Sequence, residues 1–275
     1  MKRPASGAVL ALVLLASAAF AQEDVANIPA QDLKIEGNAQ QRYFLIGEVP
    51  KTVPKEGLGL LIVLPGGDGS AEFHPFVKRI YANGLPENYL VAQLVAVPSK
   101  NPNQTVWPTA KSPDPKQKFA TEDYLKAVVA DVKAKHPIDE ARIFTLSWSS
   151  GGPAAYAASL APDTPVKGSL VAMSVFIPAK LPPLDAAKGQ RYFLLHSPED
   201  QVCKYVFAKN AKAVLTKHGA EVETLDYPGG HGWRGDVFGN IRAGVGWLEA
   251  ERAPQPTTSA TGPTSKPAAR TPSKK

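Results

Sequence analysis

The sequence predicts an α/β fold: a doubly wound, mostly parallel sheet with helices on both faces and no large cap domain. Short, continuously apolar runs are typical of strands buried on both faces of a parallel sheet. These runs alternate with segments of helical spacing, as crossover connections require. Residues 22–252 contain no internal repeat and no second compositional unit. About 230 residues therefore suit one domain with a full core.

The expected elements follow the chain in order. Alternating polar and apolar residues predict a leading antiparallel strand pair at 33–36 and 42–49. The later strands are expected at 58–64, 89–97, 142–146, 168–175, 191–196 and 221–227, and the helices at 73–83, 121–136, 151–160, 205–218 and 237–251. Thr121 is expected to cap its helix, and Gly219 to end another in a left-handed conformation. A long polar loop is expected at 98–117, a length that often accompanies function.

The two ends of the chain differ from the rest. Residues 1–21 read as a signal peptide with a basic start, an apolar middle and a small-x-small cleavage site at 19–21. This predicts export to the periplasm or outside the cell, the alternative being an uncleaved N-terminal anchor. No other stretch is long and apolar enough to cross a bilayer, so no stable membrane insertion is expected after cleavage.

Residues 253–275 have no aromatic and no acidic residue, and their composition predicts a disordered Pro/Thr/Ser/Lys tail. Lys2, Arg3 and the tail's four basic residues account for the whole formal net charge of +6. The domain at 22–252 is therefore close to neutral, which argues against nucleic-acid binding. The tail either touches an acidic surface or serves solubility.

Cys203 is the only cysteine, so an intramolecular disulfide is excluded. A lone cysteine can be a nucleophile, but no histidine motif surrounds this one. We expect a small buried or half-buried residue.

The central motif is a serine between an apolar run and an alanine-rich segment. Small-x-Ser-x-Gly at such a boundary is the pattern of a nucleophile elbow, a sharp strand-to-helix turn that exposes the serine hydroxyl. The positions two before and two after the serine must be small. Ser147 and Gly151 meet this requirement for Ser149, whereas taking Ser150 as the nucleophile would place Trp148 at a small-residue position. A plain Ser/Gly-rich loop is the alternative.

A serine nucleophile needs a histidine base, and the histidine needs a carboxylate that fixes its tautomer. Such groups gather in loops at the carboxyl ends of parallel strands. After Ser149, the loops that follow strands offer Asp200 and His231 in the chain order Ser, Asp, His. Glu199 is the alternative acid, and Asp226 is expected to face away.

The other histidines have structural interpretations. His74 and His136 are expected at the surface, and His218 at a helix carboxyl terminus, where a cation suits the dipole. His196 is expected to pack beneath Asp200.

The tetrahedral intermediate needs backbone donors aimed at its oxyanion. Ser150 supplies one N–H group. We expect Gly67 to supply the second, with Asp68 as the rival donor from the same loop. A plain turn is the alternative for this loop, and a phosphate loop would need a Gly-Lys-Ser/Thr sequence that is missing.

On these residues, the chain from 58 to 251 resembles the α/β-hydrolase superfamily. It is similar to a secreted esterase group of polyhydroxyalkanoate depolymerase-like, feruloyl esterase-like and dienelactone hydrolase-like proteins. The resemblance implies a nucleophile at Ser149, an acid at Asp200, a base at His231 and oxyanion donors at Gly67 and Ser150. Two departures are Ser147 where glycine is usual and Pro65 where histidine is common.

The connection at 176–190 is too short for a large cap, which predicts an open site suited to a bulky or polymer-attached ester. Phe176, Ile177, Pro178, Leu181 and Leu184 are candidates for the acyl wall, and Trp107 for the leaving-group wall. Trp148 is a further candidate for substrate binding. Ordinary packing is the alternative for all of these side chains.

The sequence thus predicts an exported serine hydrolase that cleaves carboxylic esters through an acyl-enzyme, with no metal and no organic cofactor. Two alternatives stay open. A peptidase of the same fold would use the same three residues. A catalytically silent module would bind an envelope partner or a polymer.

Overall fold

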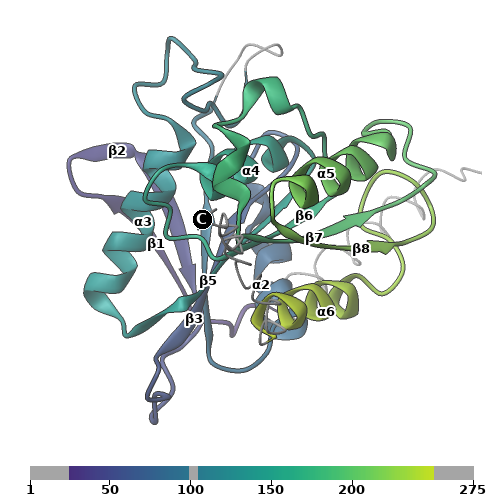
Figure 1. Cartoon of the computed structure of the whole chain (residues 1–275). Helices are drawn as coiled ribbons and strands as arrows, with labels where there is room; N and C mark the ends of the chain where they lie inside the picture. The colour runs from purple at the N-terminus through teal and green to yellow at the C-terminus, as the bar shows by residue number, and fades with distance from the viewer. Residues whose placement is uncertain (1–24, 99–104, 251–275) are drawn as a thin grey trace, which may run out of the picture.

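The computed structural model describes residues 25–98 and 105–250. The predicted signal peptide and tail lie outside these residues. Within them, a sheet of eight strands has the order β1-β2-β4-β3-β5-β6-β7-β8 (Figure 1). The strands from β3 to β8 pair in parallel, and β1 and β2 form an antiparallel hairpin whose second strand pairs with β4. This confirms the predicted doubly wound sheet.

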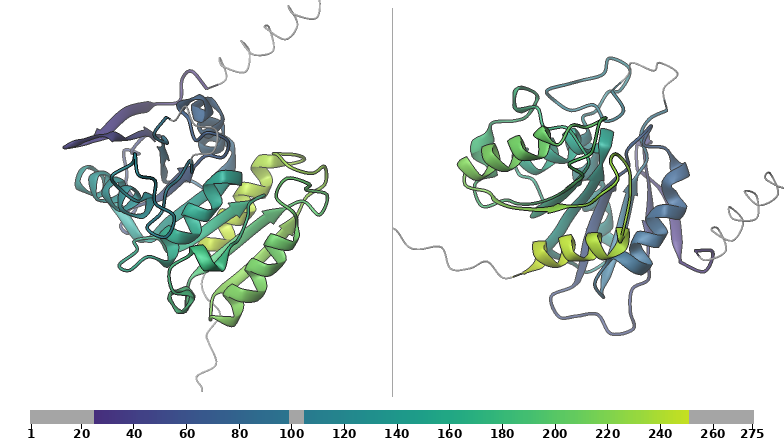
Figure 2. Two further views of the ribbon diagram at one scale, coloured as in Figure 1. Left: turned by 90° about the horizontal axis from the view of Figure 1, so that it is seen from above. Right: turned by 90° about the vertical axis from the view of Figure 1, so that its right-hand side faces the viewer.

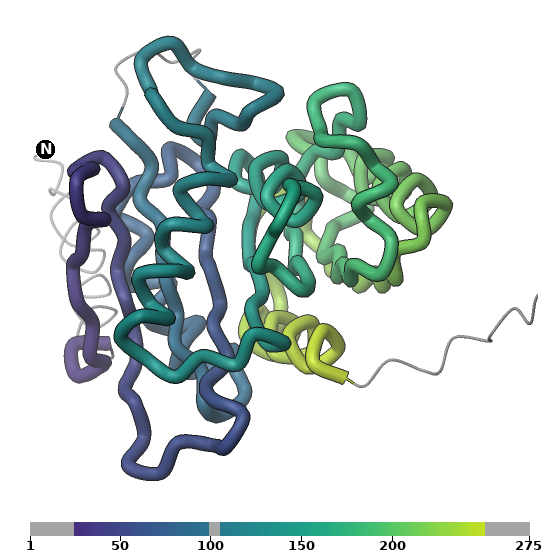
Figure 3. Tube along the Cα trace, turned by 60° about the vertical axis from the view of Figure 1, so that its left-hand side comes forward, coloured from purple at the N-terminus to yellow at the C-terminus, as the bar shows by residue number. Residues whose placement is uncertain are grey.

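The strands agree closely with the apolar runs. Their bounds are β1 Ala30–Ile35, β2 Asn38–Ile46, β3 Leu58–Leu64, β4 Tyr89–Leu94, β5 Ile138–Trp148, β6 Gly168–Ala172, β7 Arg191–His196 and β8 Glu221–Asp226. All residues of β3, β4, β6 and β7 are buried, as expected for strands covered on both faces. The hairpin of β1 and β2 forms one edge of the sheet (Figure 3).

Helices cover both faces (Figure 2). The α2 helix (His74–Gly84) and the α6 helix (Val237–Glu249) pack on one face, and α3 (Thr121–Lys135), α4 (Gly152–Leu160) and α5 (Val206–Lys217) on the other. Four short 3-10 turns complete the described elements: η1 Ala71–Phe73, η2 Ser149–Gly151, η3 Pro178–Lys180 and η4 Leu184–Ala187. The last two fill the 176–190 connection, which holds no cap domain.

The described helices contain no segment with the length and hydrophobicity that a bilayer span requires.

The structure corrects the cap predicted at Thr121. Ala120 occupies the N-cap position of α3 without a side-chain hydrogen bond. Thr121 is the first helical residue, and its hydroxyl donates to the carbonyl oxygen of Pro108 at 2.7 Å. The side chain therefore ties the long loop to the helix instead of capping it.

His74 was expected at the surface and is instead half-buried. Its ring stacks on Phe44 with centroids 4.0 Å apart, and Nδ1 lies 3.1 Å from Oε1 of Gln93. Burial lowers the pKa of His74. The prediction for Gly219 is confirmed, because its φ is 83° directly after α5.

Candidate active site

Ser149 lies at a strained turn between β5 and α4. Its φ is 50°, a left-handed conformation that side-chain-bearing residues rarely adopt. The chain passes from Trp148, the last residue of β5, through η2 into α4. The hydroxyl of Ser174 donates to the carbonyl oxygen of Ser149 at 2.6 Å and helps to hold this backbone. The geometry is that of the predicted nucleophile elbow.

Small residues are required around the elbow, as the sequence predicted. A Cβ atom on Gly151 would lie 2.3 Å from the carbonyl oxygen of Leu64, at the end of the neighbouring strand β3. Ser147 is fully buried. The elbow therefore touches the backbone of β3 directly, with no room for a side chain between them.

The three residues predicted for catalysis lie together. Nε2 of His231 lies 3.2 Å from Oγ of Ser149, and Nδ1 of His231 lies 2.8 Å from Oδ2 of Asp200. A carboxylate accepts the Nδ1 proton, which leaves Nε2 free to accept the proton of the serine. The arrangement can therefore deprotonate a serine hydroxyl and stabilise the imidazolium that results.

Asp200 is held by its own loop. Its Oδ1 accepts hydrogen bonds from the N–H groups of Val202 and Cys203, both at 2.8 Å, and the residue is 2% exposed. Burial acts to raise the pKa of Asp200, but the hydrogen bonds from His231 and these two N–H groups outweigh it and lower the pKa. The carboxyl group is therefore ionised at neutral pH.

The rival carboxylates do not reach His231. Oε2 of Glu199 accepts from the N–H of Gly229 at 3.2 Å, and the exposed Asp226 accepts from the hydroxyl of Tyr205. His196 lies beneath Asp200 as expected: its Nε2 donates to the carbonyl oxygen of Cys203 at 2.6 Å and lies 3.4 Å from Oδ2 of Asp200.

Cys203 is buried, as the sequence predicted. Its thiol lies near the hydroxyl of Ser149. Burial and the charge of Asp200 raise the pKa of Cys203 to about 11. The thiol is therefore protonated at neutral pH and a poor nucleophile.

The loop after β3 packs tightly against the elbow. A Cβ atom on Gly66 would lie 2.5 Å from the ring of Trp148. The hydroxyl of Ser150 donates to the carbonyl oxygen of Gly67 at 2.8 Å. In a trans peptide the next N–H points the opposite way, so the N–H of Asp68 is turned away from the hydroxyl of Ser150. The choice of Gly67 over Asp68 as the second oxyanion donor stays a prediction.

The predicted substrate walls are corrected in part. Trp148 and Phe176 are 5% and 2% exposed, respectively, and both pack in the interior. Trp148 contacts Phe73, Phe76 and Trp233, and the edge of Phe176 meets Tyr156 with centroids 5.0 Å apart. Burial of such large apolar rings stabilises the fold more than exposure in a cleft would. Among the described residues that line the pocket containing Trp107, neither Trp148 nor Phe176 occurs.

Trp107 does line a pocket, together with Ile177 and Leu181. The sequence placed Trp107 on the leaving-group side and the other two on the acyl side, whereas all three share one cavity of about 210 Å³. Trp107 is only 3% exposed, and its Nε1 donates to the carbonyl oxygen of Pro65 at 2.9 Å. The long loop after β4 is therefore anchored to the oxyanion loop.

Two residues of the site were missed by the sequence reasoning. Tyr156, on α4, lines this pocket. Trp233 packs against Trp148 with centroids 5.6 Å apart and so joins the His231 loop to the elbow. A signal was available for Trp233, because this large aromatic residue follows His231 by only two positions in the sequence.

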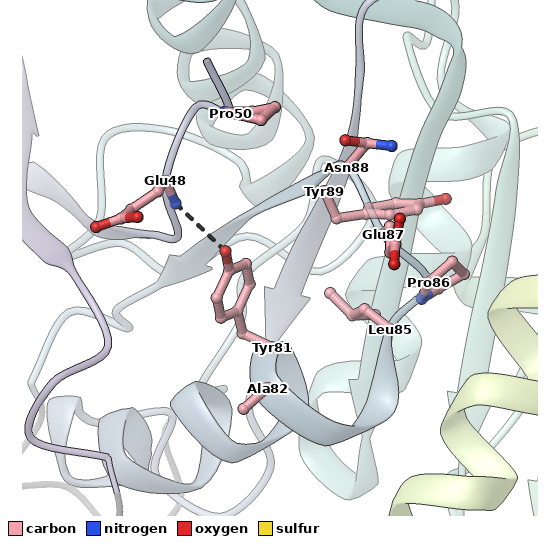
Figure 4. Close-up of a pocket in the computed structure, with 9 residues that line it drawn as sticks. All are labelled: Glu48, Pro50, Tyr81, Ala82, Leu85, Pro86, Glu87, Asn88 and Tyr89. Atoms are coloured by element: carbon pink, nitrogen blue, oxygen red, sulfur yellow. Dashed lines mark hydrogen bonds between the residues drawn. The ribbon is translucent and has the colours of Figure 1, made fainter. Parts of the chain in front are cut away.

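A larger hollow of about 460 Å³ lies between Glu48, Tyr81 and Tyr89 (Figure 4). It is formed where β4 begins, whereas Ser149 follows the end of β5, a strand that runs in the same direction. The hollow is thus at the opposite edge of the sheet from Ser149.

Among the described residues no group of three or more potential metal ligands occurs.

Comparison with known proteins agrees with this fold. Residues 102–243, more than half of the chain, match the family described as phospholipase/carboxylesterase. No curated protein matches the chain by sequence.

Solved structures with the same fold include three ester or serine hydrolases. A fluorophosphonate-binding serine hydrolase of Staphylococcus aureus has a TM-score of 0.62 and 12% identity, covering 82% of this chain and 98% of its own. An esterase of Rhizomucor miehei has a TM-score of 0.60 and 15% identity, covering 90% and 92%. A carboxylesterase of Mesorhizobium loti has a TM-score of 0.55 and 17% identity, covering 79% and 98%. The chain therefore belongs to the phospholipase/carboxylesterase family of α/β-hydrolases, a family of serine ester hydrolases.

Proposed function

We propose that this chain is an exported serine esterase that uses Ser149, His231 and Asp200 as its catalytic triad. The observation that carries the proposal is the continuous chain of contacts from Oγ of Ser149 through His231 to the buried carboxylate of Asp200. Export rests on the signal-like sequence at 1–21.

The reaction has two halves. Oγ of Ser149 attacks the ester carbonyl carbon while Nε2 of His231 takes the hydroxyl proton, and the resulting oxyanion accepts hydrogen bonds from the N–H groups of Gly67 and Ser150. The tetrahedral intermediate then expels the alcohol, which receives its proton from His231. A water molecule, deprotonated by His231, attacks the acyl-enzyme; the bond to Oγ of Ser149 then breaks, His231 returns the proton to Oγ, and the acid is released. Asp200 holds the histidine tautomer throughout.

Ester hydrolysis by purified protein tests the proposal. Wild type should turn over p-nitrophenyl acetate and butyrate and react with a fluorophosphonate probe, and Ser149→Ala should do neither. His231→Gln should reduce turnover by about 10³-fold or more. His218→Gln is the matched control, because His218 also pairs with a carboxylate, Asp185 at 2.9 Å, but away from Ser149.

Three outcomes would count against the proposal. A folded wild type that ignores both esters and the probe would favour a silent binding module. Probe labelling with peptide but no ester turnover would favour a peptidase. Undiminished turnover in Ser149→Ala would place the nucleophile elsewhere.

A further inference from the structure

The pocket beside the elbow contains an unused hydrogen-bond donor. Tyr156 is 3% exposed, and within residues 25–98 and 105–250 its hydroxyl makes no hydrogen bond. Tyr156 is one of the residues that line the pocket, and its side chain is otherwise almost fully buried. Buried hydroxyl groups usually have a hydrogen-bond partner, because burying a hydroxyl without a hydrogen bond costs free energy. A ligand atom is the partner that this position lacks.

The ring of Tyr156 is fixed in place. Phe176 packs edge-on against it, and Tyr192 lies on it with centroids 5.8 Å apart. The two buried tyrosines differ, because the hydroxyl of Tyr192 is 2.8 Å from Oγ of Ser159 and is thereby satisfied. The hydroxyl of Tyr156 is therefore a preorganised donor rather than a mobile one.

A positive charge lies at the same pocket. Lys180, on η3, is exposed and lines it, and the ammonium group forms no ion pair with any described residue. No acidic residue is among the described residues that line the cavity. The remaining wall is mainly apolar, with Trp107, Pro153, Val175 and Leu181 contributing. The pocket thus offers an apolar body with an O–H donor and a cation.

The position of the pocket indicates which half of an ester substrate, acyl or alcohol, it would bind. The leaving alcohol must reach Nε2 of His231 to take its proton. None of the described residues that line the pocket comes from 197–205 or 227–236, the loops that hold Asp200 and His231. Pro153 instead connects the pocket to the first turn of α4, just after Ser149. A pocket on this side of the nucleophile would take the acyl group rather than the leaving alcohol.

We propose that this pocket binds a short acyl chain that ends in an anionic oxygen, so that the preferred substrates are half-esters of dicarboxylic acids. The volume of about 210 Å³ is below the roughly 300–1,000 Å³ of pockets for drug-sized ligands, which limits the chain length. Tyr156 donates a hydrogen bond to the terminal carboxylate and Lys180 supplies the opposite charge. This inference rests on the esterase function proposed above.

Two esters with acyl chains of equal carbon number test it: monoethyl glutarate and ethyl pentanoate, followed by pH-stat titration. Ethyl esters are used because a neighbouring carboxylate attacks more activated esters without enzyme. Wild type should show a kcat/KM for the glutarate ester at least about tenfold above that for the pentanoate ester, as one buried hydrogen bond to a charged group provides.

Tyr156→Phe should lower kcat/KM for the glutarate ester by about tenfold and leave the pentanoate ester within about twofold. Lys180→Met should lower kcat/KM for the glutarate ester by about threefold, and added salt should reduce this difference from wild type. Tyr192→Phe and Lys188→Met are the matched controls and should leave the ratio of the two esters unchanged.

Turnover of both esters with no preference for glutarate, or a preference that Tyr156→Phe leaves intact, would overturn the inference while the esterase function stands. Hydrolysis of neither ester, nor of p-nitrophenyl acetate, would refute the esterase function and this inference with it.

Discussion

Gly151→Ala tests whether the contact between the elbow and β3 is as tight as the geometry indicates. The added Cβ would lie 2.3 Å from the carbonyl oxygen of Leu64 and 3.2 Å from that of Pro65. Carbon and oxygen atoms that merely touch lie about 3.3–3.6 Å apart, so the backbone must open by about 1 Å. Overpacking of this kind typically costs about 1–3 kcal/mol. The obstacle is strand backbone rather than a flexible side chain, so we expect about 3 kcal/mol.

The same displacement should impair catalysis. The strand that must move leads directly into the loop of Gly67, and a shift of about 1 Å in a catalytic group can cost roughly 10²-fold in rate. We expect Gly151→Ala to unfold about 6–12 °C below wild type and to lose about 10²-fold in kcat. Thermal unfolding followed by circular dichroism and p-nitrophenyl butyrate turnover measure the two effects.

Gly246→Ala is the control. Gly246 is exposed on α6, and an added Cβ would meet nothing within 4 Å. Alanine favours helix over glycine by about 0.8–1.0 kcal/mol, so this variant should be slightly more stable and fully active. If Gly151→Ala unfolds at the wild-type temperature and keeps its kcat, the reasoning about close approach is refuted.

Other predictions concern the residues around the nucleophile. Asp200→Asn should reduce kcat by about 10⁴-fold, because the amide no longer fixes the His231 tautomer. The pKa of Asp200 is lower in the folded state than in the unfolded state. The ionised carboxylate therefore stabilises the fold fully above the unfolded pKa of about 3.9, and this stabilisation is lost as the pH falls through the lower folded pKa. In urea titrations, the difference in free energy of unfolding between wild type and Asp200→Asn should shrink below about pH 4. Cys203, with a pKa of about 11, should resist iodoacetamide at pH 8 until the protein unfolds. Trp233→Leu removes the ring contact with Trp148, worth about 0.5–1.5 kcal/mol, and should lower kcat more than it raises KM; a lower Tm with unchanged kcat would indicate a purely structural role.

Much of the fold could be predicted because the strands are buried on both faces. The strands 58–64 and 191–196 were predicted with their observed bounds, since polar turns adjoin their apolar runs. The strand predicted at 168–175 ends at Ala172, because Met173 adopts a φ of 39° and turns the chain. The apolar pattern continues past that point for packing reasons, so hydrophobicity alone gives no stop signal.

The proximity of Ser149, His231 and Asp200 could also be predicted, because chain order and loop position restrict the choice of histidine and carboxylate. Residues whose role depends on side-chain packing could not be predicted from the sequence. A buried Phe176 and a pocket-lining Trp107 look alike in sequence, since both are aromatic residues in loops beside the site. The hydroxyl of Tyr156 could not be recognised either, because only the three-dimensional neighbourhood reveals that no described residue forms a hydrogen bond with it.

The position of β8 at the edge of the sheet has a consequence for inactivation. Within the described sheet this strand pairs only with β7, and its residues are half-buried or exposed, in contrast to the buried central strands. Edge elements with few buried contacts open at lower free energy than the core. His231 lies in the loop that follows β8, whereas Ser149 follows the central strand β5. Mild heat or denaturant should therefore displace His231 first. The result should be a reversible, inactive species in which the amides of the central sheet are still protected from hydrogen exchange.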